Sequence, residues 1–250
     1  MTSRNAQTPG SDTTISTNFP GATRDSTARR DARLAGGALG LAALLAIAGF
    51  TALGSIFQYP QILAEPVDDI LALYRAHQGA VMFWFGVLAV SAGLMAPAGI
   101  WIGRLAAGRL GRAVAVVGVA AALVQVVGLQ RWLTIVPGIS AAALDPARHA
   151  AAVESFSRWH TILGKAIGET LGYALTATFT VLVVVALRRL GLPRWLAVTG
   201  VAAAVLIATG VVIPVVAAAS LSNFAGYVVW CLWLLAVAVI LIRGRRAATA

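Results

Sequence analysis

Residues 223–246 read NFAGYVVWCLWLLAVAVILIRGRR. The first 20 residues, 223–242, contain no charged side chain, and three arginines follow within the last four residues. A helix needs about 20 apolar residues to cross the roughly 30 Å hydrocarbon layer of a bilayer. Arginine is costly inside that layer and gathers on the non-translocated side of membrane proteins. The stretch therefore predicts a transmembrane helix over residues 223–242 whose C-terminal end is held on one side by charge.

Five further apolar runs of similar length precede this one. The whole chain is 59% hydrophobic and 11% charged, with a mean hydropathy of +0.84, which is more apolar than a soluble domain can bury. The sequence predicts an all-α, polytopic membrane protein with six transmembrane helices. These spans are residues 34–57, 79–102, 113–137, 160–187, 195–217 and 223–242.

The arginines fall mainly on one side of these spans. The net charge of +10 therefore reflects membrane topology, and we expect no nucleic-acid partner. The positive-inside rule places both termini in the cytoplasm. Fourteen arginines are then inside: 4, 24, 29, 30, 33, 104, 109, 112, 188, 189, 194, 243, 245 and 246. Four are outside: 75, 131, 148 and 158.

The segments outside the spans divide into tails and loops. Residues 1–33 are rich in Ser, Thr, Asp and Arg and predict a disordered cytoplasmic tail, and residues 243–250 a short C-terminal one. The N-terminal tail is a candidate contact for a cytoplasmic partner, a second copy of the chain or anionic lipid. The outer loops, 58–78 and 138–159, each contain an amphipathic stretch that predicts a helix lying on the membrane surface.

The fourth span carries the least expected residues, because Lys165 and Glu169 lie inside an apolar segment where ionisable groups are costly. Counting from the start of the span places Glu169 near mid-membrane, one turn from Lys165. Arg131 and Gln125 on the third span bracket its depth and are its expected partners. Gly164, Gly168 and Gly172 form a small-residue strip for close helix packing. This group is either a substrate or proton site or a network that fixes helix register.

The chain has only three histidines and one cysteine, which limits the metal or haem sites that it can form. His77 and His160 both lie at the outer mouth of a span, so haem or metal ligation is an alternative to interfacial hydrogen bonding. No metal-ligand spacing is recognisable, and the single cysteine, Cys231, excludes an intramolecular disulfide. Four tryptophans near span ends are expected to be interfacial anchors, namely Trp101, Trp132, Trp159 and Trp195.

The segments GLPRWLAVTGVAAAVL and NFAGYVVWCLWLLAVAVILIRGRR, with FQYPQILAEP after the first span and GETLGY in the fourth, give the chain a likeness to a known family. It resembles bacterial polytopic membrane proteins classed as domain-of-unknown-function family 4386. The match is carried by Gly191 to Leu196, by Trp230 and Trp233 and by the closing arginines. The resemblance implies a six-span fold in a bacterial cytoplasmic membrane and supplies no reaction.

Three classes of function remain. The first is binding or transport of a small molecule or proton through a polar site near Glu169, lined by Lys165, Arg131 and Gln125. The second is a regulatory or assembly subunit without chemistry of its own. The third is a haem- or metal-binding protein that uses His77 and His160. No catalytic motif is recognisable, which makes an enzyme the less favoured class.

Overall fold

The computed structural model describes residues 20–216 and 218–244. These residues are almost entirely helical, and the described part of the chain contains no strand. Six of its helical stretches are long and apolar enough to cross a membrane. The predicted all-α, six-span membrane fold is confirmed.

Several spans are built from more than one helical segment. The first span is α1 (Pro20–Phe57), the fifth is α9 (Arg194–Ala208) with η3 (Thr209–Val212), and the sixth is α10 (Ala219–Arg243). The second is α3 (Gln78–Gly93) with α4 (Met95–Ala106), and the third is α5 (Gly108–Thr134) with α6 (Val136–Ala142). The fourth joins α7 (His149–Trp159), the π-helix η2 (His160–Leu171) and α8 (Gly172–Arg189). Between the first two spans lie η1 (Gln61–Ala64) and α2 (Val67–Ala76).

Consecutive spans lie side by side and close into a ring. α1 contacts α3 and α4, these contact α5, α5 contacts η2 and α8, α8 contacts α9, α9 contacts α10, and α10 returns to α1. Every connection between neighbouring spans is therefore made around the ring, which is the arrangement expected when short turns join antiparallel helices.

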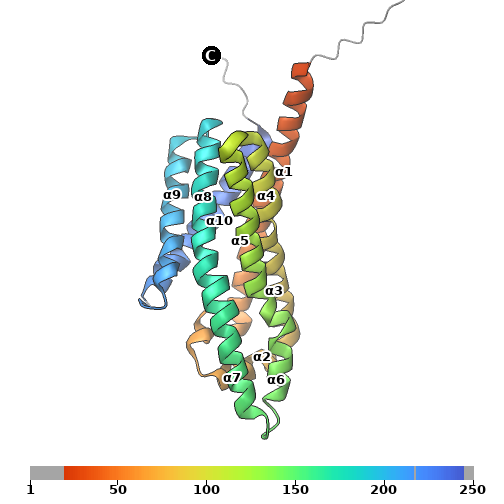
Figure 1. The fold of residues 1–250 in the computed structure, drawn as a ribbon, viewed down its shortest axis with the longest axis vertical. Coiled ribbons are helices and arrows are strands. Elements are labelled where there is room, and N and C mark those ends of the chain that lie inside the picture. Colours follow the sequence, from red (N-terminus) through yellow and green to blue (C-terminus); the bar gives the residue numbers. More distant parts are fainter. Residues whose placement is uncertain (1–19, 217, 245–250) are drawn as a thin grey trace, which may run out of the picture.

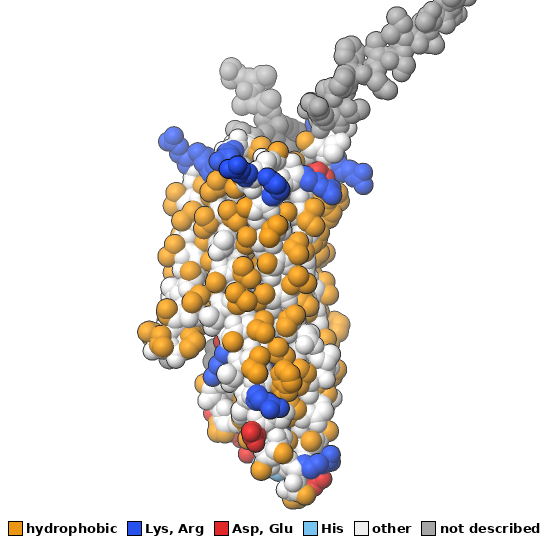
Figure 2. Space-filling model, in the orientation of Figure 1, with side chains coloured by type: hydrophobic (Ala, Val, Ile, Leu, Met, Phe, Trp, Pro, Cys, Tyr) orange, Lys and Arg blue, Asp and Glu red, His pale blue; other side chains and the backbone are white. Residues whose placement is uncertain are grey.

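The two ends of the bundle differ in charge. A band of Lys and Arg side chains crosses one end, and an apolar belt separates it from mixed charges at the other (Figure 2). We call the first the arginine end, where the described start of α1, the α4–α5 and α8–α9 turns and the close of α10 lie together (Figure 1). The opposite end, with η1, α2, α6 and α7, is called the distal end. An arginine band bordering an apolar belt is what a membrane boundary requires.

Two sequence-based expectations about the segments outside the spans need correction. Helix α1 begins at Pro20, so residues 20–33 of the predicted disordered tail are helical; residues 1–19 and 245–250 lie outside the described part of the chain. Helices form in both outer loops as predicted, but both are joined to the bundle. α7 runs into the fourth span without a break, and α2 buries Ile70, Leu71 and Tyr74 against protein.

An aromatic core fills the distal end. Trp132 is fully buried there, with its ring 4.9 Å from Phe85, 5.2 Å from Phe57 and 6.1 Å from Phe156. The Tyr74 hydroxyl donates a 2.9 Å hydrogen bond to the Trp132 carbonyl oxygen. The expectation that Trp132 is an interfacial anchor is therefore wrong, because α2 and α7 fold over this end and enclose the ring.

Candidate functional site

The fourth span approaches α5 through glycines. A Cβ atom added at Gly128 of α5 would lie 2.6 Å from the Gly168 Cα, so the two backbones are in contact. One added at Gly172 would lie 3.3 Å from the Gln125 side chain, and one at Gly164 would lie 3.0 Å from the Arg131 guanidinium. The glycine strip thus faces the helix that carries both expected polar partners. Close backbone approach through small residues is typical of helix pairs in membranes.

Gly164 and Gly168 lie in a π-helix of 12 residues, and Gly172 begins the α-helix that follows it. A π-helix makes i→i+5 hydrogen bonds, so its turns are wider than those of an α-helix, and such segments are frequent at functional sites. Lys165 is exposed and Glu169 is partly buried within it. No ion pair joins these two side chains in the described part of the chain. Arg131 and Gln125, the expected partners of Glu169, make no ion pair or hydrogen bond with it among the described residues.

Arg131 is held by groups of its own helix. Its side chain is 5% exposed, the guanidinium Nη1 donates a 2.5 Å hydrogen bond to the Gly128 carbonyl oxygen, and the group lies 5.2 Å from the Trp132 ring centroid. Nη2 faces Gly164 on the fourth span. No carboxylate lies within ion-pair distance among the described residues. The guanidinium is therefore buried and oriented, and most of its donors remain available.

Glu169 is the carboxylate whose charge acts on the Arg131 guanidinium. Arg131 and Lys165 are the two cations whose fields act on the carboxylate. Within the described chain, however, the carboxylate makes no hydrogen bond and no ion pair. A partly buried carboxylate usually acquires such partners, because burial without them costs free energy.

Two tyrosines join this group that the sequence-based analysis did not select. Tyr59 follows α1 and packs its ring 5.3 Å from Phe85, and burial, followed by the Glu169 carboxylate, raises the pKa of its hydroxyl to about 12. Tyr173, at the start of α8, also lies within the field of Glu169 and Arg131. Both tyrosines belong to the FQYPQILAEP and GETLGY segments, which carried the family resemblance and were the available signal.

Gln125 extends the polar group toward the bundle centre. Its Nε2 donates to the Thr176 hydroxyl at 3.2 Å and to the Tyr227 hydroxyl at 3.3 Å. The Tyr227 ring lies 5.8 Å from that of Tyr173. We call the connected set the distal polar cluster. It consists of Tyr59, Gln125, Arg131, Lys165, Glu169, Tyr173 and Tyr227.

The depth of Glu169 differs from the sequence-based estimate. Glu169 precedes Arg189 at the arginine end by 20 residues, which is about 30 Å of helix. η2 also contacts η3, the last turn of the 19-residue fifth span. Glu169 thus lies near the distal membrane boundary and not near mid-membrane. Counting from His160 was misleading because the helix of the fourth span begins at His149 and projects well beyond the α9–α10 turn (Figure 1).

The histidines do not form a matched pair. His160 is 8% exposed and stacks on Phe156 with 5.7 Å between ring centroids, and neither ring nitrogen has a hydrogen-bond partner. His77 is exposed at the start of α3. Bis-histidine haem ligation needs two imidazoles that face one open site, whereas one of these rings is buried and the other exposed. No group of three or more His, Cys, Asp or Glu side chains converges within the described residues.

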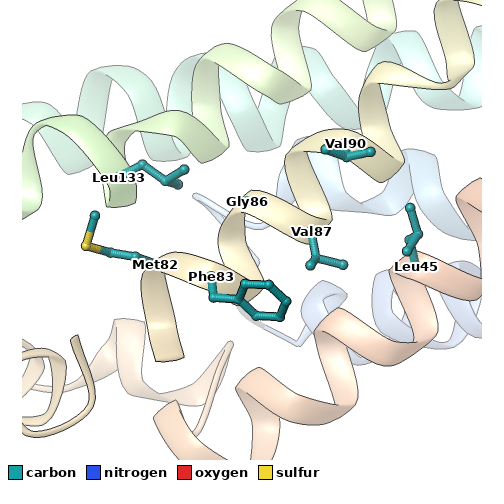
Figure 3. A pocket seen from close by; sticks show the side chains of 7 residues that line it. All are labelled: Leu45, Met82, Phe83, Gly86, Val87, Val90 and Leu133. Carbon is teal, nitrogen blue, oxygen red and sulfur yellow. The ribbon is translucent and has the colours of Figure 1, made fainter. Parts of the chain in front are cut away.

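An apolar surface hollow lies away from the distal polar cluster. It has a volume of about 530 Å³ and is formed by side chains of α1, α3 and α5, including Leu45, Met82, Phe83 and Leu133 (Figure 3). Its lining is apolar, and Phe83 is 62% exposed on the surface that faces lipid. It contains no group that could orient a polar ligand, so the distal polar cluster remains the better candidate site.

A comparison with protein families matches residues 34–238 to the family described as domain of unknown function DUF4386. The chain belongs to the DUF4386 family. The match runs from α1 into α10 and so includes all six spans of this DUF4386 protein. No curated protein matches the chain, and no solved structure does. Membership in DUF4386 assigns no reaction.

Proposed function

We propose that this DUF4386 protein binds a small polar solute at Glu169 and carries it through the membrane. The observation that supports this most is the Glu169 carboxylate, which is partly buried beside Arg131 and Lys165 and engages neither directly. Intramembrane ionisable groups are costly and commonly mark substrate or proton pathways. The solute would supply the partner that the carboxylate lacks.

The separation of the charges indicates the kind of solute. A network that serves only to fix helix register would be expected to close into direct ion pairs, because an uncompensated buried charge is destabilising. Here a guanidinium fixed by Gly128 and a separate carboxylate face one region of the bundle. A solute with both a cationic and an anionic group matches these two charges, and the hydroxyls of Tyr59 and Tyr173 can donate hydrogen bonds to it.

The distal boundary offers a route to this group. The α9–α10 turn ends well before α7 does, and Figure 2 shows a notch below it with charged side chains at its edge. Lys165 is exposed and Glu169 partly so. A solute arriving from the distal side therefore meets charged groups before it meets the closed apolar bundle. Such a mouth increases the local concentration of a charged solute.

The test is Glu169→Gln, with Glu154→Gln on the exposed face of α7 as the matched control. Purified protein is screened by thermal unfolding against small zwitterions, amines and carboxylates, since a solute that binds the folded state raises Tm. We expect at least one zwitterion to stabilise the wild type and the control but not Glu169→Gln, and to enter liposomes containing the first two proteins only.

Proton transport is the other outcome of this experiment. Liposomes under a pH gradient would then acidify with wild-type protein and not with Glu169→Gln, while no solute raises Tm. If neither solute nor proton movement depends on Glu169, the proposal is wrong. A large loss of thermal stability in Glu169→Gln, without any ligand effect in wild type, would favour the register role.

We also propose that the arginine end faces the cytoplasm of a bacterial cell and that the distal end faces outward. The charge asymmetry between the two ends supports this orientation. Cys231 is buried, so Cys231→Ala gives a background for single cysteines at the exposed positions Arg109 and Ala147. A membrane-impermeant maleimide on intact cells should label Ala147→Cys and not Arg109→Cys. The reverse pattern would invert the orientation.

A further inference from the structure

A second hollow lies at the arginine end, away from the distal polar cluster. It has a volume of about 300 Å³ and lies between the α8–α9 turn and the close of α10. We call it the arginine-end groove. Its lining consists of Gly191, Pro193, Val239, Ile240, Arg243 and Gly244.

The groove lies at the membrane boundary. Trp195, two residues beyond Pro193, is 64% exposed, and an exposed indole at a span end is typical of the lipid headgroup level. Val239 is 45% exposed one turn deeper on α10, so this wall continues into the lipid-facing surface. One end of the groove therefore meets headgroups and the other meets acyl chains.

The charge in the groove is positive and unpaired. Arg243 is exposed and forms no ion pair within the described residues. Asp31 is the only acidic side chain described at this end, and it lies 3.9 Å from Arg104. Arg188 instead donates a hydrogen bond to the Leu192 carbonyl oxygen and so holds the α8–α9 turn. The Arg243 guanidinium remains available for an anion from outside the chain.

Two glycines shape the headgroup side. Gly191 has φ +91° and Gly244 has φ +65°. Residues other than glycine rarely adopt these backbone conformations. A Cβ atom added at Gly244 would meet nothing within 4 Å. The backbone therefore turns sharply at both positions, and the space beside Gly244 in the groove is open.

We propose that the arginine-end groove binds one anionic glycerophospholipid, with its phosphate on Arg243 and an acyl chain along Val239 and Ile240. The donors of a guanidinium match the geometry of a phosphate group. The apolar wall favours a lipid over free phosphate, because free phosphate would leave that wall without a contact. This proposal is independent of the solute site at Glu169.

The test uses native mass spectrometry of the full chain released from detergent with equal amounts of phosphatidylglycerol and phosphatidylcholine of the same acyl chains. We expect wild type to retain phosphatidylglycerol preferentially. Arg243→Gln should reduce that preference about fivefold, since one basic residue near a membrane contributes a factor of this size. Arg109→Gln, an exposed arginine of the same end outside the groove, should retain it.

A second variant keeps the test independent of charge. Val239→Trp fills the apolar side of the groove and should also release phosphatidylglycerol, with Arg243 intact. Equal retention of the two lipids by wild type would overturn the proposal, as would unchanged preference in both variants. Displacement of the lipid by inorganic phosphate at low millimolar concentration would show a simple anion site and would overturn the acyl-chain contact.

Discussion

The two halves of the bundle are held together differently. Near the arginine end, α4 and α5 touch through their backbones, and a Cβ atom added at Gly111 would lie 2.2 Å from the Gly103 carbonyl oxygen. In the distal half an aromatic core surrounds Trp132, and polar groups lie beside it. Small residues close the half at the arginine end, whereas the distal half adds aromatic and polar side chains to the glycine contact between α5 and the fourth span.

The cause of this difference is where the spans end. The α9–α10 turn stops near η2, while α1, α3, α5 and the fourth span continue past it. An incomplete ring cannot close on glycine contacts alone, and α2 and α7 fold over it instead. At this level Lys165 is exposed and Glu169 partly so, whereas a polar group in the hydrocarbon would need an internal partner.

The largest expected effect tests the aromatic core. Trp132→Ala removes a fully buried ring and should lower the free energy of unfolding by about 3–5 kcal/mol. It also removes the ring beside the Arg131 guanidinium. Thermal or denaturant unfolding in detergent measures the loss.

The control is Trp195→Ala, which truncates an indole that is 64% exposed at the arginine end. It should change stability by no more than about 0.5 kcal/mol in detergent. If both variants lose a similar amount of unfolding free energy, Trp132 is not packed more tightly than Trp195, and the comparison fails.

The second prediction concerns the close backbone contact between Gly103 of α4 and Gly111 of α5. Gly111→Ala forces a methyl group onto the Gly103 carbonyl and should cost about 1–3 kcal/mol through overpacking. Gly37→Ala on α1 meets nothing within 4 Å and should stabilise the helix by about 0.5–1 kcal/mol. The two variants carry the same chemical change, so Tm shifts of the same sign would contradict the close contact.

The smallest effect compares two tyrosines of the distal half. Burial alone raises the pKa of Tyr74 to about 12, whereas burial and the Glu169 carboxylate together raise the pKa of Tyr59 to about 12. In Glu169→Gln the Tyr59 hydroxyl should therefore ionise at lower pH, and Tyr74 should not change. Tyrosinate absorbance during alkaline titration, in Tyr59→Phe and Tyr74→Phe backgrounds, separates the two groups.

The same shifts define a pH dependence of stability. A hydroxyl whose pKa is raised on folding contributes stability that is present below pH ~10, its unfolded value, and is lost as pH rises to about 12. Wild-type stability should fall across this window, and Tyr59→Phe should fall less steeply. An identical decline in both proteins would place Tyr59 outside the buried cluster.

Part of the candidate site could be predicted from sequence. Glu169 and Arg131 stood out because charged residues in apolar segments need a reason, and the structure places them within electrostatic reach of each other. Tyr59 was not selected, since a tyrosine in a loop carries no such signal and its approach depends on how the chain turns after α1. The depth of Glu169 was also misjudged, because the start of a helix is poorly defined by hydropathy alone when an amphipathic segment continues it.

The sequence by itself determined the membrane location, the six helices and the segregation of arginine, because hydrophobic length and charge act locally along the chain. Tertiary structure decided the rest. The ring order brought the glycines of the fourth span onto α5. The fifth span ends, and the sixth begins, short of the distal end, which leaves the distal half without these two helices. There α2 and α7 bury Trp132. These outcomes depend on contacts between residues far apart in the chain, and they set whether a given polar group meets lipid, protein or water.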